Sequence, residues 1–443
     1  MLHRIKSTII PVGFLSISML AFASHAEPIK NSVAQDENRL LSIFKHLHAN
    51  PEHAFMEHET AALVADELNK HGFEVHTGIA KTGVVGILKN GDGPVIMFRS
   101  DMDALPIKEE TDLAYKSTAI KKDRFGNELP VMHACGHDAH TTWLIGMAKQ
   151  LAERKSDWQG TLVLVAQPAE ELIEGATAMV NDDLYKIAPE PDMIISAHTM
   201  AVIPADSVGI RDGRRMAGTD QIDVTLYGVG GHGSTPHAAI DPVVMGSMAV
   251  MGYQTIVSRA IDQYQPAVLT VGAFQAGDTN NIIPGSATLK VNLRWYNEYE
   301  REQMIKGIKS VTNNIAEMYN VPEDKMPTYK MKGYAGPVIN NFPEDTQRAK
   351  QAMASTLGSD KVLLGLPPLM GSEDFQMLGS PYPDARILFV EIGSGKPDVY
   401  SNYIDKQMLP EVLNHNSKYV VEQQSIATGT AALTALVLEF LQK

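Results

Sequence analysis

The sequence predicts an α/β protein whose main domain is built on a mixed, mostly parallel sheet and carries an inserted α+β domain. Three observations predict this fold. Short apolar runs alternate with helical stretches in the first half of the chain, as in layered α/β folds. Near Arg214 the runs change to alternating apolar and polar residues, which is typical of half-buried strands. The chain of 443 residues is also too long for one ordinary core, so two domains are expected.

The elements of the main domain follow from the spacing of its apolar residues. Helical spacing occurs in three stretches, at residues 36–48, 58–72 and 141–153. Short apolar runs that suit buried strands occur at residues 84–88, 95–98, 162–166 and 193–196. We therefore expect a layer of helices against a buried sheet.

The inserted domain is predicted to have the order strand, helix, strand, strand, helix. Its elements are expected at residues 221–227, 242–262, 267–274, 286–295 and 298–318. The chain then returns to the main domain and ends in an amphipathic helix at 425–442. The predicted boundaries are 1–26 for a signal peptide, 27–215 and 330–443 for the main domain, and 216–329 for the inserted domain.

Residues 1–26 have the order of a secretory signal peptide. Arg4 and Lys6 give a basic start, residues 8–23 are largely apolar, and Ser24-His25-Ala26 places small residues where a signal peptidase cleaves. The apolar stretch is short for a membrane span, which needs about 20 apolar residues. We expect cleavage before Glu27 and a soluble protein in the periplasm or secreted beyond it, since no later segment is expected to span a membrane.

The charge of the chain argues against two classes of partner. The formal net charge is −14, and loss of the predicted signal peptide removes two basic residues and no acidic one. Such a chain is repelled by nucleic acid and by anionic lipid, and we find no basic stripe that would reverse this. Cys135 is the single cysteine, so its thiol is expected to be buried, reactive or bound rather than in an internal disulfide.

The most informative segment for chemistry is His-Ala-Cys-Gly-His-Asp at residues 133–138. Cys135 and His137 stand two residues apart in a turn that Gly136 can tighten, so a thiolate and an imidazole can bind one ion or one each of a pair. Asp138 can orient an imidazole through its second ring nitrogen. Taken alone, such a pair more often marks a buried structural cysteine beside incidental histidines.

Two adjacent carboxylates stand at another predicted strand end. Glu170 and Glu171 follow the apolar run at 162–166, and ligands bind at such ends in open α/β sheets. One carboxylate can bind a metal while the other holds a water molecule and takes its proton. Alone, such a pair more often marks the solvated first turn of a helix, where the helix dipole favours glutamate.

Other polar residues join them, each a weak signal alone. They are Asp101 and Asp103 after the strand at 95–98, His198 after the strand at 193–196, Glu373 and Asp374, and His415 before the final helix. Asp101 or Asp103 could support a ligand from behind. A set that combines a thiolate, imidazoles and carboxylates suits a transition metal better than calcium or magnesium.

Six motifs occur in one order along the chain: RSDMDALPIKEET, HACGHDAHTT, QPAEE with GATAM behind it, GVGGHGSTPHAAIDPV, NIIP and GSEDF. By these motifs the chain resembles the two-metal amidohydrolases that include hippurate hydrolase, aminoacylase-like enzymes and indole-acetyl-amino-acid hydrolases. The resemblance runs from about residue 40 to 441. It implies cleavage of the amide bond of N-acyl amino acids or related small substrates, with the inserted domain as the lid and dimerisation domain of a homodimer.

The resemblance also implies roles for individual residues. Two divalent transition-metal ions, manganese, zinc, cobalt or nickel, would be bound. Cys135 would bridge the ions, Glu170 would be the general base, and the remaining ligands would be His137, Glu171, His198 and His415.

Three lid residues would complete the site. His232, in the GGHG loop, would reach the active site of the partner subunit and stabilise the oxyanion. Asn281 and Arg294 match lid positions that hold the substrate.

The chain departs from the family pattern in two places. The usual His-Ser-Pro-like context reads His415-Asn416-Ser417 here, and the segment after His198 is not the common form. Three alternatives remain open. The first is a dipeptidase or carboxypeptidase, and the second is an enzyme that uses Cys135 as nucleophile. The third is a non-catalytic binding protein, which the presence of Glu170 and all five candidate ligands disfavours.

Overall fold

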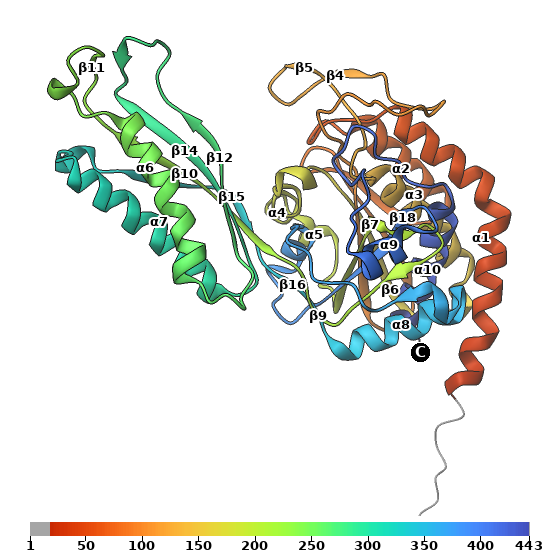
Figure 1. Ribbon diagram of the computed structural model, residues 1–443. Coiled ribbons are helices and arrows are strands. Elements are labelled where there is room, and N and C mark those ends of the chain that lie inside the picture. The colour runs from red at the N-terminus through yellow and green to blue at the C-terminus, as the bar shows by residue number, and fades with distance from the viewer. Residues whose placement is uncertain (1–17, 443) are drawn as a thin grey trace, which may run out of the picture.

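The computed structural model describes residues 18–442 and contains a large α/β domain and an elongated lid domain (Figure 1). Residues 1–17 of the predicted signal peptide lie outside the described part. Residues 18–26 form the first turns of helix α1 (Ser18–Ala49), which continues past the predicted cleavage point.

The large domain is built on an eight-stranded sheet of mixed direction, with β3, β6, β7 and β18 parallel at its centre. Antiparallel pairs add β1 and β2 at one edge, and β8 joins β18 antiparallel at the other. In spatial order the strands are β1 (Glu74–Ile79), β2 (Gly83–Asn90), β6 (Gly160–Gln167), β3 (Val95–Asp101), β7 (Met193–Pro204), β18 (Arg386–Gly395), β8 (Val208–Gly209) and β17 (Val362–Leu363). The predicted mixed, mostly parallel sheet is confirmed.

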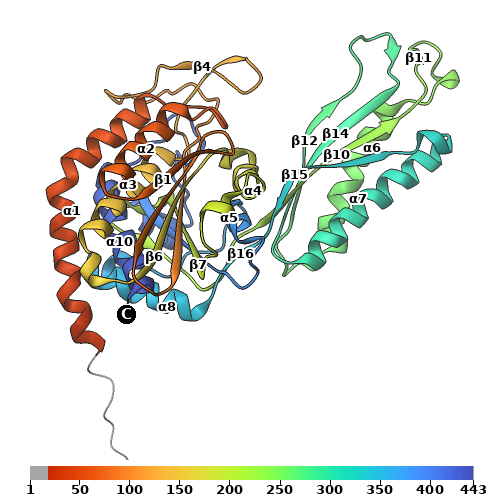
Figure 2. The same ribbon diagram turned by 180° about the vertical axis from the view of Figure 1, so that it is seen from behind.

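Both faces of this sheet are covered at its centre, so the inner strands carry buried apolar residues on both faces. In β6, Leu162 and Leu164 join one core while Val163 and Val165 join the core on the opposite face. This alternation is the period-2 geometry of a strand. The first core packs under α1, α2 (His58–Lys70), α3 (His137–Glu153), α8 (Pro343–Leu357) and α10 (Gln424–Leu441), and the second under α4 (Gly175–Asn181) and α5 (Leu184–Ile187) (Figure 1, Figure 2).

The last helix differs from its prediction as an amphipathic helix. In α10, residues 425–441 are buried except for the half-buried Ala427. The helix is long and apolar enough to cross a membrane by length and composition, yet 89% of it is buried inside the domain. It contacts α1, α3 and α8, so its apolar residues serve the core on every side.

The lid is a four-stranded antiparallel sheet with two helices on one face (Figure 1). Its strands in spatial order are β12 (Val268–Gln275), β14 (Ser286–Trp295), β10 (Gly218–Tyr227) and β15 (Thr328–Gly336). Helices α6 (Pro242–Thr255) and α7 (Glu298–Met318) bury residues such as Met245, Tyr253 and Met304 against Val224 and Leu289 of the sheet. The helix predicted at 242–262 ends its regular α-turns at Thr255 and continues as a π-helical turn to Ala260.

The predicted end of the inserted domain at residue 329 is too early. Strand β15 pairs with β10 from Thr328 to Gly336, so the lid sheet continues to Gly336. The two connections between the domains then run side by side as β9 (Gly213–Met216) and β16 (Ile339–Asn341), which pair antiparallel. The pattern of apolar residues runs on without a break at this point, so the boundary could not be recognised from the sequence.

Candidate metal centre

The candidate site lies at the carboxyl ends of the parallel strands. Asp101 ends β3 and Gln167 ends β6. His198 lies in the middle of β7, two residues beyond Ser196, where the pairing of β7 with β3 ends. The segments that follow β3 and β6 carry Asp103 and Glu170. This is the edge at which open α/β sheets bind ligands, as the sequence predicted for Glu170 and His198.

The Cys135–His137 turn is fixed by its central glycine. Gly136 has φ +91°, and a Cβ atom there would lie 2.6 Å from Oγ1 of Thr199. Both features require glycine, because a side chain at this position is strained and would also collide. Helix α3 begins at His137, four residues earlier than predicted, so the imidazole projects from the first turn of the helix.

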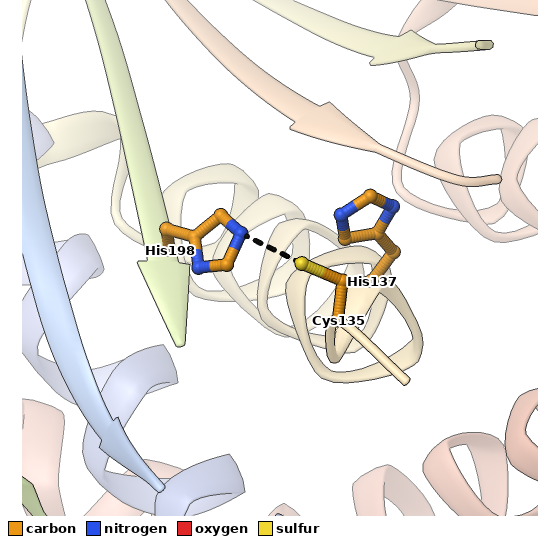
Figure 3. A group of neighbouring side chains, drawn as sticks. All are labelled: Cys135, His137 and His198. Atoms are coloured by element: carbon orange, nitrogen blue, oxygen red, sulfur yellow. Dashed lines mark hydrogen bonds between the residues drawn. The ribbon is translucent and has the colours of Figure 1, made fainter. Parts of the chain in front are cut away.

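Two imidazoles are held in one orientation by backbone carbonyls. Nδ1 of His137 donates to the carbonyl of Asp103 at 2.8 Å, and Nδ1 of His198 donates to the carbonyl of Thr199 at 2.7 Å. Their Nε2 atoms are thereby left to face the cluster, and Nε2 of His198 lies 3.3 Å from Sγ of Cys135 (Figure 3). This is the arrangement in which protein imidazoles bind metals through Nε2.

His415, which lies 280 residues after Cys135 along the chain, joins the same cluster. Its Nε2 atom lies 3.1 Å from Sγ of Cys135 and 3.4 Å from Oε1 of Glu171. The residue has φ +71°, and its amide donates to the carbonyl of Ala134 at 2.7 Å. A residue other than glycine keeps a left-handed backbone conformation only where the surrounding structure imposes it, and such residues often lie at functional sites. The side chain is 54% exposed, so the cluster opens to solvent beside His415.

Cys135 belongs to two groups of potential ligand atoms at once. In one group, the ligand atoms of Cys135, His137 and His198 lie within 4.8 Å of one another; in the other, those of Cys135, Glu171 and His415 do. The five predicted ligands therefore divide into two sets that share the sulfur. Two such sets could hold two cations, and the Cys135 thiolate is within reach of both sets.

The electrostatics of the cluster favour cations. Burial lowers the pKa of His137, but the carboxylates of Asp101, Asp103 and Glu171 outweigh burial and raise this pKa to about 10. Within residues 18–442, Nε2 of His137 is buried without a hydrogen-bond partner. Buried surplus carboxylates and an unpartnered imidazole nitrogen are what a metal-binding site requires, so the residues fit a transition-metal pair.

Glu170 differs sharply from its neighbour Glu171. Burial, Glu373 and Glu171 together raise the pKa of Glu170 well above its usual value. Burial raises the pKa of Glu171 as well, but His415 and His137 outweigh it and lower that pKa. Two adjacent carboxyl groups with opposite pKa shifts are suited to different tasks, one as a proton acceptor and one as an anionic ligand.

Asp103 and Asp138, the two carboxylates predicted to support the ligands, make different contacts in the structure. Asp103 supports the cluster: its Oδ1 lies 3.3 Å from Nδ1 of His137, and its carboxylate accepts the amides of Glu170 and Glu171. Asp138 does orient an imidazole, but that of His48, at 2.7 Å, rather than one of the candidate ligands. The prediction was wrong in its target because His48 lies 90 residues earlier, on α1.

The predicted lid residues fall into two places. Arg294 lies near the large domain, where its guanidinium donates to Oγ of Ser372 at 2.5 Å. His232 and Asn281 lie together in the loops at the far end of the lid, where the amide of Gly233 donates to the carbonyl of Asn281 at 2.8 Å (Figure 1). The structure therefore does not bring His232 or Asn281 to the cluster of their own chain.

Several supporting residues were not singled out from sequence. Arg99 is fully buried, with its guanidinium 2.7 Å from Asp101, 3.1 Å from Glu373 and 3.2 Å from Asp374. Nδ1 of His140 donates to Asp101 at 2.6 Å, since Nε2 of the same ring accepts the amide of Thr199 at 2.8 Å. Arg99 and His140 lie inside the recognised motifs RSDMD and HACGHDAH, so their presence was visible although their partners were not.

Comparison with known proteins agrees with this geometry. The family description "Peptidase family M20/M25/M40" matches residues 97–436. Hippurate hydrolase from Campylobacter jejuni is 36% identical over 397 residues, covering 89% of this chain and 95% of that protein. Thermostable carboxypeptidase 2 from Saccharolobus solfataricus is 30% identical over 421 residues, covering 94% of this chain and 99% of that protein.

A solved structure supports the same conclusion. The Bacillus subtilis YXEP protein, a dinuclear metal-binding peptidase from the M20 family, superposes with a TM-score of 0.71 at 25% identity, covering 92% of this chain and 99% of that one. The match includes both domains. The chain therefore belongs to Peptidase family M20/M25/M40 and is a metal-dependent amidohydrolase.

Proposed function

We propose that this protein hydrolyses the amide bond of N-acyl amino acids with two divalent transition-metal ions held by Cys135, His137, Glu171, His198 and His415. The observation that carries the proposal is the position of the Cys135 sulfur, which is common to both groups of ligand atoms. The substrate class is supported by 36% identity to a hippurate hydrolase. When bound, the ions would polarise the scissile carbonyl and lower the pKa of water.

Glu170 is the proton carrier in this proposal. Its carboxylate is buried beside the ligand Glu171, and its raised pKa makes it a stronger base than an exposed glutamate. It takes a proton from the attacking water molecule and delivers it to the amide nitrogen, so that the amine leaves in neutral form. Asp103 fixes the backbone from which this carboxylate projects.

Arg294 is positioned to bind the anionic end of the substrate. Its guanidinium donates to Oγ of Ser372 of the large domain. Burial lowers the pKa of Arg294, and the charge of Glu170 opposes this effect. A guanidinium binds a carboxylate in a planar, paired geometry. The chain is acidic overall, so a local cation of this kind is needed to hold an anionic product or substrate.

We further propose that the protein is a homodimer in which His232 and Asn281 complete the site of the partner subunit. Their place at the far end of the lid supports a role outside their own chain. Helix α6 of the lid also exposes Val244, Met248 and Met251, an apolar face that a second subunit could cover. His232 would donate a hydrogen bond to the oxyanion, for which one donor is typically worth about 3–4 kcal/mol.

A carboxypeptidase or dipeptidase is the second candidate, favoured by the similarity to thermostable carboxypeptidase 2. A screen of N-acyl amino acids against dipeptides with a free amino group separates the two functions. We expect faster turnover of the acylated substrates; a preference for dipeptides would contradict the proposal. Elemental analysis of the same preparation identifies the ions among manganese, zinc, cobalt and nickel, and we expect two per chain.

We also propose that the protein is exported and matures before Glu27, on the basic, apolar and small-residue order of residues 1–26. N-terminal sequencing of the protein from the cell exterior or periplasm tests this. Retention of residues 1–20 in the exported form would contradict it.

A further inference from the structure

The turn that presents Glu170 has a strained backbone. Ala169, directly before Glu170, has φ +52°, a left-handed conformation that costs a non-glycine residue energy. Such a turn persists only if the surrounding structure holds it. The amides of Glu170 and Glu171 donate to the two oxygens of Asp103, each at 3.1 Å, which leaves the amide of Ala169 to another acceptor.

That acceptor is Glu57, a residue 112 positions earlier in the chain. Oε1 of Glu57 accepts the Ala169 amide at 3.0 Å and the Phe55 amide at 2.9 Å, and the Thr82 hydroxyl donates to Oε2 at 2.5 Å. The residue is completely buried. Three donors from three segments therefore fix this carboxyl group in one place.

Glu57 stands at the start of helix α2 but does not serve that helix. Within the described chain its side chain makes no capping hydrogen bond, although it occupies the N-cap position. The first amides of α2, those of Glu59 and Thr60, donate instead to Glu52 at 3.1 and 2.9 Å. Two buried glutamates of one segment thus divide their tasks: Glu52 holds the helix and Glu57 holds the turn before Glu170.

We propose that Glu57 is a positioning residue that sets the catalytic carboxylate of Glu170 by holding the Ala169 amide. The inference rests on the proposed role of Glu170 as general base. Without Glu57, the buried amide loses its acceptor and the strained turn can relax. A displacement of the base by about 1 Å can cost on the order of 100-fold in rate. Glu170 directly follows the released Ala169, whereas Glu171 is one residue further from it and its carboxylate is also held near His415, so we expect its position as a ligand to change less.

The experiment compares Glu57→Ala, Glu57→Gln and Glu57→Asp with the matched control Glu52→Ala, all as metal-loaded enzyme. For Glu57→Ala we expect kcat to fall about 10- to 100-fold with KM and bound metal nearly unchanged. Glu57→Gln should recover most of kcat, because its amide oxygen still accepts both backbone amides and its NH₂ can donate to Thr82. Glu52→Ala loses a similar pair of backbone hydrogen bonds and should lose thermal stability while keeping kcat.

Each outcome decides one point. If Glu57→Ala and Glu52→Ala both keep kcat, or lose metal and activity in parallel, Glu57 is structural only and the inference is wrong. If Glu57→Ala does not fold, Glu57→Asp keeps the charge but shortens the reach, and normal kcat in that variant would equally overturn the inference. Glu170→Gln is measured alongside: full activity there would refute the proposed base itself, a result separate from failure of the Glu57 variants.

Discussion

Nε2 of His415 lies 3.1 Å from Sγ of Cys135, although 280 residues separate them along the chain. His415 lies in the irregular stretch between α9 (Val399–Lys406) and α10, and Cys135 lies two residues before α3; α3 and α10 pack against each other. The contact between α3 and α10 therefore brings the last candidate ligand to the first. Cys135 itself is buried, whereas the His415 side chain beside it is 54% exposed.

Cys135 is predicted to react with thiol reagents slowly in the metal-loaded protein and faster after chelation. A metal-bound thiolate is shielded, and removal of the ions frees it beside an imidazole that opens to solvent. Chelation should abolish turnover, and divalent ions should restore it. Labelling of the two forms with a thiol reagent, followed by mass spectrometry, measures this. Equal labelling rates, or turnover that survives chelation and is lost on alkylation of the metal-free form, would favour Cys135 as a nucleophile.

Glu170→Gln is predicted to keep the fold and the metal but to lose turnover by roughly 10²- to 10⁴-fold. The substitution preserves the shape of the side chain and removes the proton acceptor. Steady-state kinetics, metal analysis and melting temperature together measure the effect. Near-full activity would move the base elsewhere, and Glu373, whose pKa burial raises to about 8 and which faces Arg99 at 3.1 Å, would be the next residue to substitute.

Gly136→Ala is predicted to lower bound metal and stability more than Gly126→Ala does. Both glycines have left-handed backbones, φ +91° and +86°, so each substitution carries a similar strain of about 1–2 kcal/mol. At Gly136 the new Cβ atom would also collide with Thr199, whereas nothing lies within 4 Å of a Cβ atom at Gly126. Metal content and melting temperature are measured for both variants. Because the backbone strain is similar in the two, the difference between them reports the effect of the collision with Thr199. Equal losses would show that the close contact with Thr199 has no role in the metal centre.

The sequence showed the local parts of the site better than its distant ones. Cys135 and His137 stand out because their spacing is short, and Glu170 and Glu171 because they follow an apolar strand. His415 was only a weak candidate until the resemblance gave it a role, since its approach to Cys135 depends on packing between helices far apart in the chain. Nothing in the sequence pointed to a role for Glu57 in the site. An isolated glutamate at a helix start is usually solvated, and its burial results from the position of the Ala169 turn.

The fold was predicted in the same uneven way. The central strand β18 was not predicted, whereas strands β2, β3, β6 and β7 could be recognised because strands buried on both faces read as continuous apolar runs. The end of the lid could not, because β15 continues the pattern of half-buried strands across the boundary predicted at residue 329. Asp138 was assigned to the wrong imidazole for a related reason: its partner His48 comes from α1, and only the packing of α1 on α3 brings them together.

The His48–Asp138 pair is predicted to make stability depend on pH in the alkaline range. Burial lowers the pKa of His48, but Asp138 and Glu109 outweigh it and raise this pKa to about 9, against about 6.5 in the unfolded chain. The stabilisation is therefore complete below about pH 6.5 and is lost as the pH rises through about 9. Melting temperatures of the wild type and His48→Gln should differ most near pH 6 and converge toward pH 10. A His46→Gln control, at an exposed position of the same helix, should follow the wild type; a constant gap for His48→Gln would contradict the prediction.

His232 is predicted to act in the site of the partner subunit, so that two inactive variants can restore each other. His232→Ala and Glu170→Gln should each be inactive alone. Mixed under conditions that allow subunit exchange, they form heterodimers in which one site has Glu170 from one chain and His232 from the other. At equal amounts, half of the dimers are mixed and each has one intact site of two, so about a quarter of the wild-type activity should return.

The mixing experiment distinguishes three arrangements of His232. Recovery of activity requires that His232 and Glu170 of one working site come from different chains, since neither variant carries both. If His232 serves its own chain, through a large movement of the lid, every site in the mixture lacks one of the two residues and no activity returns. If His232 only shapes its exposed loop, where Oγ of Ser234 lies 2.7 Å from its Nδ1, then His232→Ala alone stays active, as we expect for His237→Ala in the same loop. Subunit exchange must be demonstrated independently, for instance by mass spectrometry of differently tagged chains, because an absence of recovery argues against the shared site only when mixed dimers are present.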